Sequence, residues 1–205
     1  MILQSDEAAW AQARLGRLTA SRISDALAKT KTGWGAGRAN YAAELVAERL
    51  TGVAGERFVS GPMQWGLDNE ALARASYEFF QDVSMGPAVF IIHPNNPWAG
   101  ASPDGLIGDN GLWECKCPNT ATHISTLLCD KIPSQYVTQM QWQMAVTGRT
   151  WCDFTSFDPR LPENMRLFVK RLERDDKLIS ELELEVAIFL DEVAATVEQL
   201  QRRAA

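Results

Sequence analysis

The chain has 205 residues, of which 46% are hydrophobic, and its formal net charge at pH 7 is −6. This length and apolar content are enough to bury a core, so we expect a single domain over residues 1–205. The sequence contains no apolar run of about 18 residues, which excludes a predicted membrane span and a membrane partner. The N-terminal residues lack the apolar stretch of a secretory signal, so we expect a cytoplasmic protein.

Charge is distributed unevenly along the chain. Residues 11–40 contain six basic side chains and one acidic side chain, whereas residues 173–205 contain nine acidic and four basic side chains. The negative total argues against indiscriminate coating of nucleic acid. The basic segment is either a face that contacts phosphates or an ordinary polar surface.

The first half of the chain is predicted to begin with helices and to continue with a strand. Apolar spacing predicts helices over residues 41–50 and 69–80. We interpret Gly61-Pro62 as a break before the second helix. A short apolar run then predicts a strand over residues 88–92.

A β-hairpin is the clearest local signal in the second half. Asp109-Asn110-Gly111 predicts the turn, because Asn and Gly tolerate the positive φ that hairpin turns require. The second strand is expected to run through Cys117 and to stop at Pro118, which cannot extend a ladder. The remaining elements are a helix, two strands and a long amphipathic helix, over residues 134–147, 151–157, 165–172 and 175–203. This order predicts an α/β fold with a mixed central β-sheet flanked by helices.

The hairpin brings chemically active side chains together. Side chains alternate along a strand, so Glu114 and Lys116 share one face while Cys115 takes the other. Asp104 lies just before the first hairpin strand, across the turn from Glu114. Two carboxylates and one ammonium therefore converge, as a solvated salt bridge or as a catalytic site.

As a site, this group suits magnesium-assisted hydrolysis of a phosphodiester. Mg²⁺ prefers carboxylate oxygens and water, so Asp104 and Glu114 would hold the metal. Lys116 would orient the attacking water or stabilise the charge that develops on the phosphate. The sequence therefore predicts a Mg²⁺-dependent nuclease, with Mn²⁺ as a possible substitute.

Several short motifs follow one another along the chain. They are Arg14-Leu15-Gly16, Thr19-Ala20-Ser21, Ser102-Pro103-Asp104-Gly105-Leu106, Glu114-Cys115-Lys116-Cys117-Pro118, Gln139-Met140-Gln141 and Asp158-Pro159-Arg160. In this set and order the chain resembles the YqaJ-like viral recombinase family, which comprises restriction-endonuclease-like nucleases of the lambda exonuclease type. The resemblance covers nearly the whole chain and implies a restriction-endonuclease-like core.

The resemblance implies roles for further residues. Glu70 would be another acid of the metal site, and the backbone carbonyl of Cys115 would be a further metal ligand. Arg14, Ser21 and Gln139 would form a pocket for the 5′ phosphate of the cut strand. Such a pocket is physically sensible, because Arg gives charge-assisted hydrogen bonds to phosphate.

Four polar or aromatic residues have a second interpretation. Tyr136 is a DNA-binding candidate, but an aromatic residue at such a position is more often part of a core. Without the resemblance, Glu70, Gln139 and Gln143 would be interpreted as exposed helix surface.

The resemblance also implies an activity and an assembly. The expected enzyme is a processive 5′-to-3′ exonuclease on double-stranded DNA ends, which releases 5′-phosphomononucleotides and leaves a 3′ single strand for recombination. It would act as a ring-shaped homotrimer with a single-strand annealing protein as partner, in the bacterial host of a phage or prophage. Enclosure of the substrate by a ring would explain processivity.

One segment departs from the family pattern. The stretch Gly33-Trp34-Gly35-Ala36-Gly37 is rich in glycine. We expect a mobile element near the DNA entrance, with Trp34 as a wedge between bases.

Three alternatives stay open. The first is a site-specific endonuclease of the same fold. The second is a non-catalytic DNA-binding module. The third is an iron–sulfur nuclease, since Cys115 and Cys117 form a C-x-C pattern, although no second close pair of cysteines follows it.

Overall fold

The structure, a computed structural model, describes residues 2–3, 6–31, 33–55 and 60–204. Its largest sheet has five strands in the order β11-β10-β9-β8-β5. These strands are β5 (Met85–Gly86), β8 (Gly105–Ile107), β9 (Gly111–Lys116), β10 (Trp151–Phe157) and β11 (Leu167–Glu173). β9 and β10 run parallel, and the other neighbours run antiparallel. The predicted mixed central sheet is therefore confirmed.

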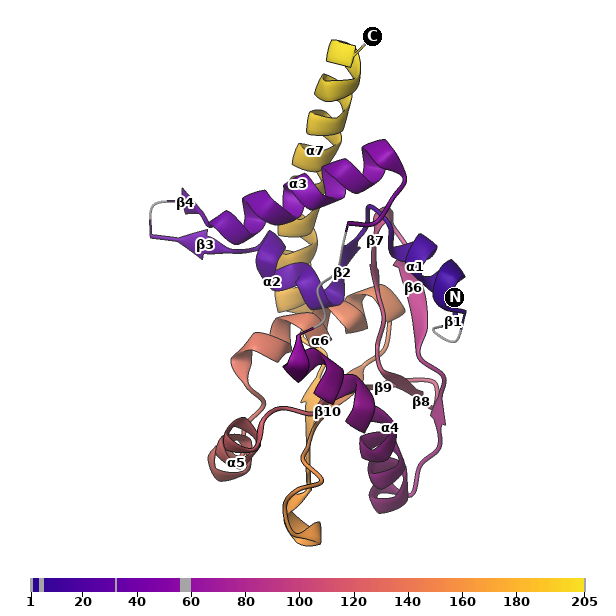
Figure 1. The fold of residues 1–205 in the computed structure, drawn as a ribbon, viewed down its shortest axis with the longest axis vertical. Coiled ribbons are helices and arrows are strands. Elements are labelled where there is room, and N and C mark those ends of the chain that lie inside the picture. The colour runs from indigo at the N-terminus through magenta and orange to yellow at the C-terminus, as the bar shows by residue number, and fades with distance from the viewer. Residues whose placement is uncertain (1, 4–5, 32, 56–59, 205) are drawn as a thin grey trace.

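A second sheet has four strands in the order β1-β6-β7-β2. Its strands are β1 (Ile2–Leu3), β2 (Leu18–Thr19), β6 (Val89–His93) and β7 (Asn96–Ala101). β2 and β7 run parallel, so the segment after Arg14 and the segment before Asp104 lie side by side. A two-stranded hairpin, β3 (Lys29–Thr30) and β4 (Gly33–Trp34), projects from the body of the molecule (Figure 1).

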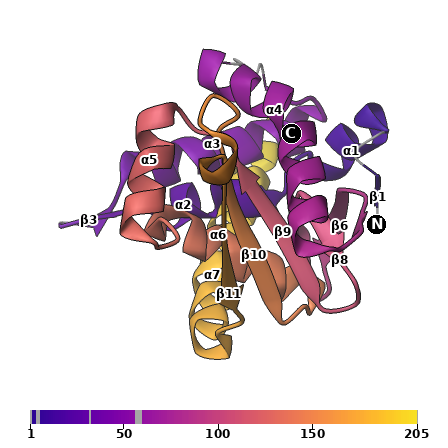
Figure 2. The ribbon, with the colours of Figure 1, turned by 90° about the horizontal axis from the view of Figure 1, so that it is seen from below.

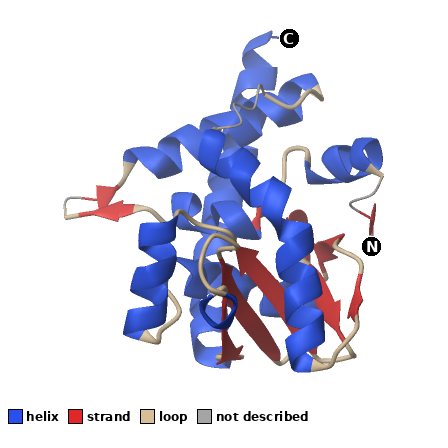
Figure 3. Ribbon diagram, turned by 60° about the horizontal axis from the view of Figure 1, so that its bottom comes forward, coloured by secondary structure: helices blue, strands red, loops and turns tan. Residues whose placement is uncertain are grey.

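Helices surround the strands (Figure 3). They are α1 (Glu7–Arg14), η1 (Ala20–Arg22), α2 (Ile23–Ala26), α3 (Ala36–Thr51), α4 (Gly61–Gln81), α5 (Thr120–Cys129), α6 (Ser134–Thr147), η2 (Glu163–Met165) and α7 (Asp176–Ala204). α4 and α7 lie on opposite sides of strands β9 to β11 (Figure 2). No helix in the described ranges is long and apolar enough to cross a bilayer.

Each face of the central sheet has its own core. Leu112 and Phe154 pack with the buried side chains of α6 and α7. Trp113 and Cys115 point the other way and pack with Tyr77 of α4. The alternation of side chains along β9 therefore separates two apolar layers.

The apolar stripe predicted for the long C-terminal helix is confirmed. Leu182, Val186, Phe189 and Val193 of α7 are buried in the first core. The helix is tied to α3 as well, because Arg38 Nη2 lies 2.8 Å from Glu192 Oε2.

Two interpretations of local sequence were wrong. Gly61-Pro62 forms the first turn of α4 instead of a break before it, and the Ser60 hydroxyl caps the helix by accepting from Met63 N at 3.4 Å. Proline is tolerated there because the first turn needs no N–H donor. In the β8–β9 turn, the residue with positive φ is Gly108, at 49°, and not Asn110.

Several element boundaries also differ from the prediction. β9 ends at Lys116, one residue earlier than expected. The glycine-rich segment contains β4 and the start of α3. α3 and α4 both begin earlier than the apolar spacing indicated, and α1, α5 and β7 were not predicted.

Asp158 closes the end of β10 with a buried carboxylate. It accepts hydrogen bonds from Thr120 Oγ1 at 2.7 Å, from Arg160 Nε at 2.7 Å and from Arg160 N at 3.0 Å. Burial raises the pKa of Asp158, but the bonds from Arg160 and Thr120 outweigh burial and lower it to about 2. The start of α5 is thereby fastened to the end of β10.

We expect Asp158→Asn to lower the free energy of unfolding at pH 7 by about 2 kcal/mol. The folded-state pKa is depressed, so this stabilisation is present above the unfolded-state pKa of about 3.9 and is lost as the pH falls toward 2. Urea unfolding of both proteins between pH 7 and pH 2 measures the difference. A difference that stayed constant down to pH 2 would contradict the assignment.

Candidate active site

Glu114 is the most enclosed acid of the predicted site. Its side chain lies on the α6 side of β9 and has no exposed surface. Oε1 accepts a hydrogen bond from Gln139 Nε2 at 2.6 Å, and Oε2 accepts one from Gln143 Nε2 at 2.6 Å. Lys116 Nζ donates to Oε1 as well. Three donors therefore hold one buried carboxylate.

Gln143 is the residue that sequence reasoning missed. Its expected place was the helix surface, but its side chain is completely buried. Gln139 and Gln143 are four residues apart on α6, so both amides face β9. That spacing is the one signal in the sequence that could have paired them.

Asp104 lies beside Glu114, as the hairpin predicted. Its Oδ2 accepts a hydrogen bond from Cys115 N at 2.8 Å. The N–H and C=O of a strand residue point to the same side, so the Cys115 carbonyl also faces Asp104. Burial and then the charge of Glu114 raise the pKa of Asp104 well above its usual range, while Lys116 acts in the opposite direction.

Lys116 supplies the positive charge of the site. Burial disfavours its charged form, but the carboxylates of Glu114 and Asp104 outweigh burial and raise the pKa of Lys116. The side chain is therefore an ammonium at neutral pH. Its Nζ also lies 5.3 Å from the ring centroid of Tyr136.

Glu70 approaches the same group from α4. It lines a pocket of about 460 Å³ together with Asp104 and Arg74. Burial raises the pKa of Glu70, Lys116 lowers it and Glu114 raises it further. Glu70, which the resemblance implies as a metal-site acid, is half-buried and within electrostatic reach of Lys116 and Glu114.

The donor atoms fit a hard divalent cation. Asp104, Glu114, Glu70 and the Cys115 carbonyl offer oxygen ligands, which Mg²⁺ prefers. The raised pKa values of Asp104 and Glu70 come from burial and from like charge, and a bound cation would relieve both effects. Among the described residues, no group of three or more His, Cys, Asp or Glu side chains is arranged so that it could hold a metal ion by itself.

Three of the four cysteines lie in the protein interior. Cys115 and Cys117 are buried with their sulfurs 4.0 Å apart. Cys152 is buried elsewhere and Cys129 is exposed, and all four are free thiols.

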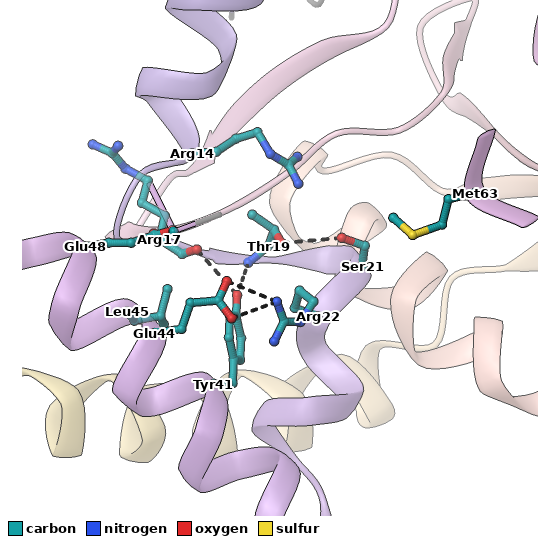
Figure 4. A pocket seen from close by; sticks show the side chains of 11 residues that line it. Arg14, Arg17, Thr19, Ser21, Arg22, Tyr41, Glu44, Leu45, Glu48 and Met63 are labelled. Atoms are coloured by element: carbon teal, nitrogen blue, oxygen red, sulfur yellow. Dashed lines mark hydrogen bonds and ion pairs between the residues drawn. The ribbon is translucent and has the colours of Figure 1, made fainter. Parts of the chain in front are cut away.

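A second pocket lies next to the carboxylates and contains two of the predicted phosphate ligands. Arg14 and Ser21 line it with Arg17 and Met63, and its volume is about 480 Å³ (Figure 4). We call it the Arg14 pocket. Arg14 Nη1 donates to Ser102 Oγ at 2.9 Å, and Ser102 is two residues from Asp104.

The resemblance implied that Gln139 lines the same pocket as Arg14 and Ser21, but the structure places its side chain elsewhere. The described lining of the Arg14 pocket does not include it, and its amide donates to Glu114 instead. It remains near this pocket, because α6 packs against η1, which carries Ser21.

The two aromatic candidates lie in contrasting environments. Tyr136 packs against the core, with its ring stacked on Phe154 at 5.4 Å between centroids. Trp34 is 45% exposed on the β3–β4 hairpin. The guanidinium of Arg38 lies 3.9 Å from its ring centroid, and Lys29 Nζ lies 4.8 Å away.

Comparison with known proteins identifies the class. A family model for the YqaJ-like viral recombinase domain matches residues 9–150, more than half of the chain. The structure is similar to that of an alkaline exonuclease (LHK-Exo) from Laribacter hongkongensis, with a TM-score of 0.89 and 49% sequence identity over 96% of this chain and 97% of that chain. The structure of LHK-Exo in complex with dAMP matches with the same values.

A more distant likeness supports the fold alone. A phage-related exonuclease from Haemophilus somnus 129PT gives a TM-score of 0.70 at 13% identity, over 90% of this chain and 96% of that chain. A comparison with curated protein sequences found no match.

The chain therefore has the nuclease fold of the alkaline exonuclease structures. It belongs to the YqaJ-like viral recombinase family. Family membership and the match to LHK-Exo together indicate a DNA exonuclease.

We expect Gln143→Leu to lower the free energy of unfolding by about 1–3 kcal/mol, because one oxygen of the buried Glu114 carboxylate loses its donor. Chemical denaturation measures the effect. Gln135→Leu is the matched control, since Gln135 is an exposed glutamine of the same helix. Equal stability of the two variants would show that the Gln143 contact does not support Glu114.

Proposed function

We propose that the protein is a Mg²⁺-dependent exonuclease that degrades one strand of double-stranded DNA from its 5′ end. It releases 5′-phosphomononucleotides and leaves a 3′ single strand for recombination by annealing. The observation that carries this proposal is the position of the Arg14 pocket, which is joined by the Arg14–Ser102 hydrogen bond to the turn that holds Asp104. A pocket lined by arginines beside a carboxylate site suits an enzyme that binds a terminal phosphate and cleaves the phosphodiester next to it.

The residues around Asp104 and Glu114 have different roles in the reaction. Asp104, Glu114, Glu70 and the Cys115 carbonyl would hold Mg²⁺, with Mn²⁺ as a substitute. When bound, the metal supplies polarisation of the phosphate and acidification of a water molecule. Lys116 remains charged beside Glu114 and stabilises negative charge that develops on the phosphate oxygens.

The glutamines of α6 keep the site in order. Gln139 and Gln143 each donate to one oxygen of Glu114, so the carboxylate keeps a fixed orientation. Oε1 already accepts from Gln139 and Lys116, whereas Oε2 accepts from Gln143 alone and retains a further lone pair for a metal, because a carboxylate accepts about four hydrogen bonds in total. Ligating carboxylates are commonly oriented by such donors.

The Arg14 pocket sets the 5′-to-3′ direction of degradation. Arg14 offers charge-assisted hydrogen bonds to a terminal phosphate, and Ser21 adds a neutral donor. Arg17 and Arg22 also line the pocket, and Arg22 is paired with Asp25 and Glu44. A 5′ phosphate in this pocket would place the next phosphodiester toward Asp104.

Other surface features support DNA engagement and assembly. The projecting hairpin presents Trp34 with 45% of its surface exposed, which suits a wedge that contacts bases. The helix α4 exposes large apolar side chains at Met63, Leu67, Leu72, Phe79 and Phe80. Such a surface supports contact with other copies of the chain in a homotrimer, and enclosure of DNA by a ring would give processivity.

The annealing protein is the least specified partner. The outer side of α7 carries several acids, and part of that surface is already paired within the chain, through Lys29 with Glu185 and Arg38 with Glu192. The remaining acidic surface is our candidate for contact with the annealing protein or with a neighbouring subunit.

The test is degradation of linear duplex DNA labelled at either end, with Mg²⁺ and with chelator. We expect Mg²⁺-dependent loss of the 5′ label, faster from 5′-phosphate than from 5′-hydroxyl ends. Lys116→Ala should lower the rate at least about a hundredfold, because it removes the charge at the reacting phosphate. The exposed-lysine variant Lys177→Ala is the control and should keep the full rate.

A closed-circle substrate separates the alternatives. Cutting of the circle would favour an endonuclease of the same fold. Binding of DNA without cutting under any metal would favour a non-catalytic DNA-binding module. Visible absorbance that bleaches on loss of activity would favour an iron–sulfur enzyme.

A further inference from the structure

Three side chains form a cationic and aromatic patch that begins at Arg17, in the lining of the Arg14 pocket, and extends away from that pocket. Trp98 of β7 is 43% exposed. The guanidinium carbon of Arg49 lies 4.0 Å from its ring centroid, and that of Arg17 lies 5.9 Å from it. We call Arg17, Arg49 and Trp98 the Trp98 patch.

The two guanidiniums are held in place by backbone carbonyls. Arg17 donates to Pro97 O and Ala13 O, each at 2.7 Å, and Arg49 Nε donates to Gly16 O at 2.9 Å. Carbonyl acceptors fix the positions of the guanidiniums but do not neutralise their charge. The patch is therefore preorganised while its charge remains available.

Among the described residues, no acid forms an ion pair with the patch: neither Arg17 nor Arg49 has a carboxylate within ion-pair distance. The adjacent acid, Glu48, is buried and accepts from Gly16 N at 2.7 Å. Burial and then the charge of Arg17 lower the pKa of Arg49 to about 10, so Arg49 is still charged at neutral pH. An anion at this surface would relieve the repulsion between Arg17 and Arg49.

The position of the patch decides which part of a DNA substrate can reach it. Trp98 precedes Ala99 and Gly100, which pair with Leu18 and Thr19 of β2. The chain then continues past Ser102, which contacts Arg14, to Asp104. Trp98 therefore lies about 13 Å from Ser102 along the strand direction, on the side of the Arg14 pocket away from Asp104.

Figure 4 shows the same order within the pocket. The guanidinium of Arg17 lies at one end and Met63 of α4 at the other, with Arg14 and Ser21 between them. α4 is also the helix that carries Glu70. Arg17 thus leads away from the carboxylates and toward Trp98.

We propose that the Trp98 patch binds the uncut strand as single-stranded DNA. This inference rests on the proposed function, in which the 5′ end of the cut strand occupies the Arg14 pocket and the duplex continues past Asp104. The cut strand ends at the pocket, so only its unpaired complement can extend over the patch. Arginines that contact phosphate and an exposed aromatic ring on which a base stacks are the features of a sequence-independent single-strand site.

The experiment measures affinity without cleavage, by fluorescence anisotropy of the whole protein in the presence of chelator. The probes are a short duplex with a 5′ phosphate and a blunt end, and the same duplex with a 3′ overhang of about eight thymidines, a length within the range that one single-strand module covers. We expect the overhang to tighten binding about tenfold, because stacking and phosphate contacts are added.

Variants connect that gain to the patch. Trp98→Ala should abolish the gain, and Trp98→Phe should keep most of it. Arg17→Gln should reduce the gain and its dependence on salt, because a phosphate contact is lost. Arg202→Gln is the matched control, since Arg202 has an 81% exposed side chain at the end of α7.

The outcomes separate this inference from the proposed function. Equal affinity for blunt and overhanging duplexes, or an undiminished gain in Trp98→Ala, would overturn the single-strand site even when blunt DNA is degraded from its 5′ end. A gain that depends on Trp98 supports the site. Absence of 5′-directed degradation in the same preparations would instead overturn the proposed function.

Discussion

The charge of Glu114 is buried between β9 and α6, and its environment governs the arrangement around it. A carboxylate without exposed surface is costly unless donors satisfy it. Lys116 donates from the same strand, and Gln139 and Gln143 donate from α6. The docking of α6 on the sheet is therefore tied to the geometry of the site, and loss of either glutamine would leave part of a buried charge without a partner.

The alternation of side chains along β9 links this site to the stability of the fold. Glu114 and Lys116 face α6, while Trp113 and Cys115 pack in the core beneath α4. A shift of one residue in register would exchange the two sets and bury the site residues in an apolar layer. The backbone takes part too, because Cys115 N holds Asp104 while its side chain stays in the core. One strand thus supplies an acid, a cation, a backbone anchor and a core contact.

Much of this site follows from local rules. The alternation of side chains predicts that Glu114 and Lys116 share a face, and a turn before a hairpin brings Asp104 to them. The apolar stripe of α7 likewise follows from helical spacing and is confirmed. These features depend on short-range geometry, which a sequence carries directly.

Features that depend on tertiary packing were not predictable in the same way. Gln143 looks like helix surface until α6 is placed against Glu114. Gln139 contacts Glu114 and does not line the Arg14 pocket, because the docking of α6 directs its amide toward β9. The proximity of Glu70 depends on how α4 crosses the sheet, and it was expected only from a family resemblance. Residues of η1, β2 and β7 converge through parallel pairing of short strands that show no clear periodicity.

The central claim is that Asp104 and Glu114 form the metal centre of a nuclease. Its most direct test is the affinity for Mn²⁺, measured by electron paramagnetic resonance on the wild type, Asp104→Asn and the control Asp109→Asn, an exposed acid in the adjacent β8–β9 turn. The account predicts that Asp104→Asn weakens Mn²⁺ binding by at least about tenfold and that Asp109→Asn leaves it unchanged. Equal Mn²⁺ affinity of all three proteins would contradict the assignment.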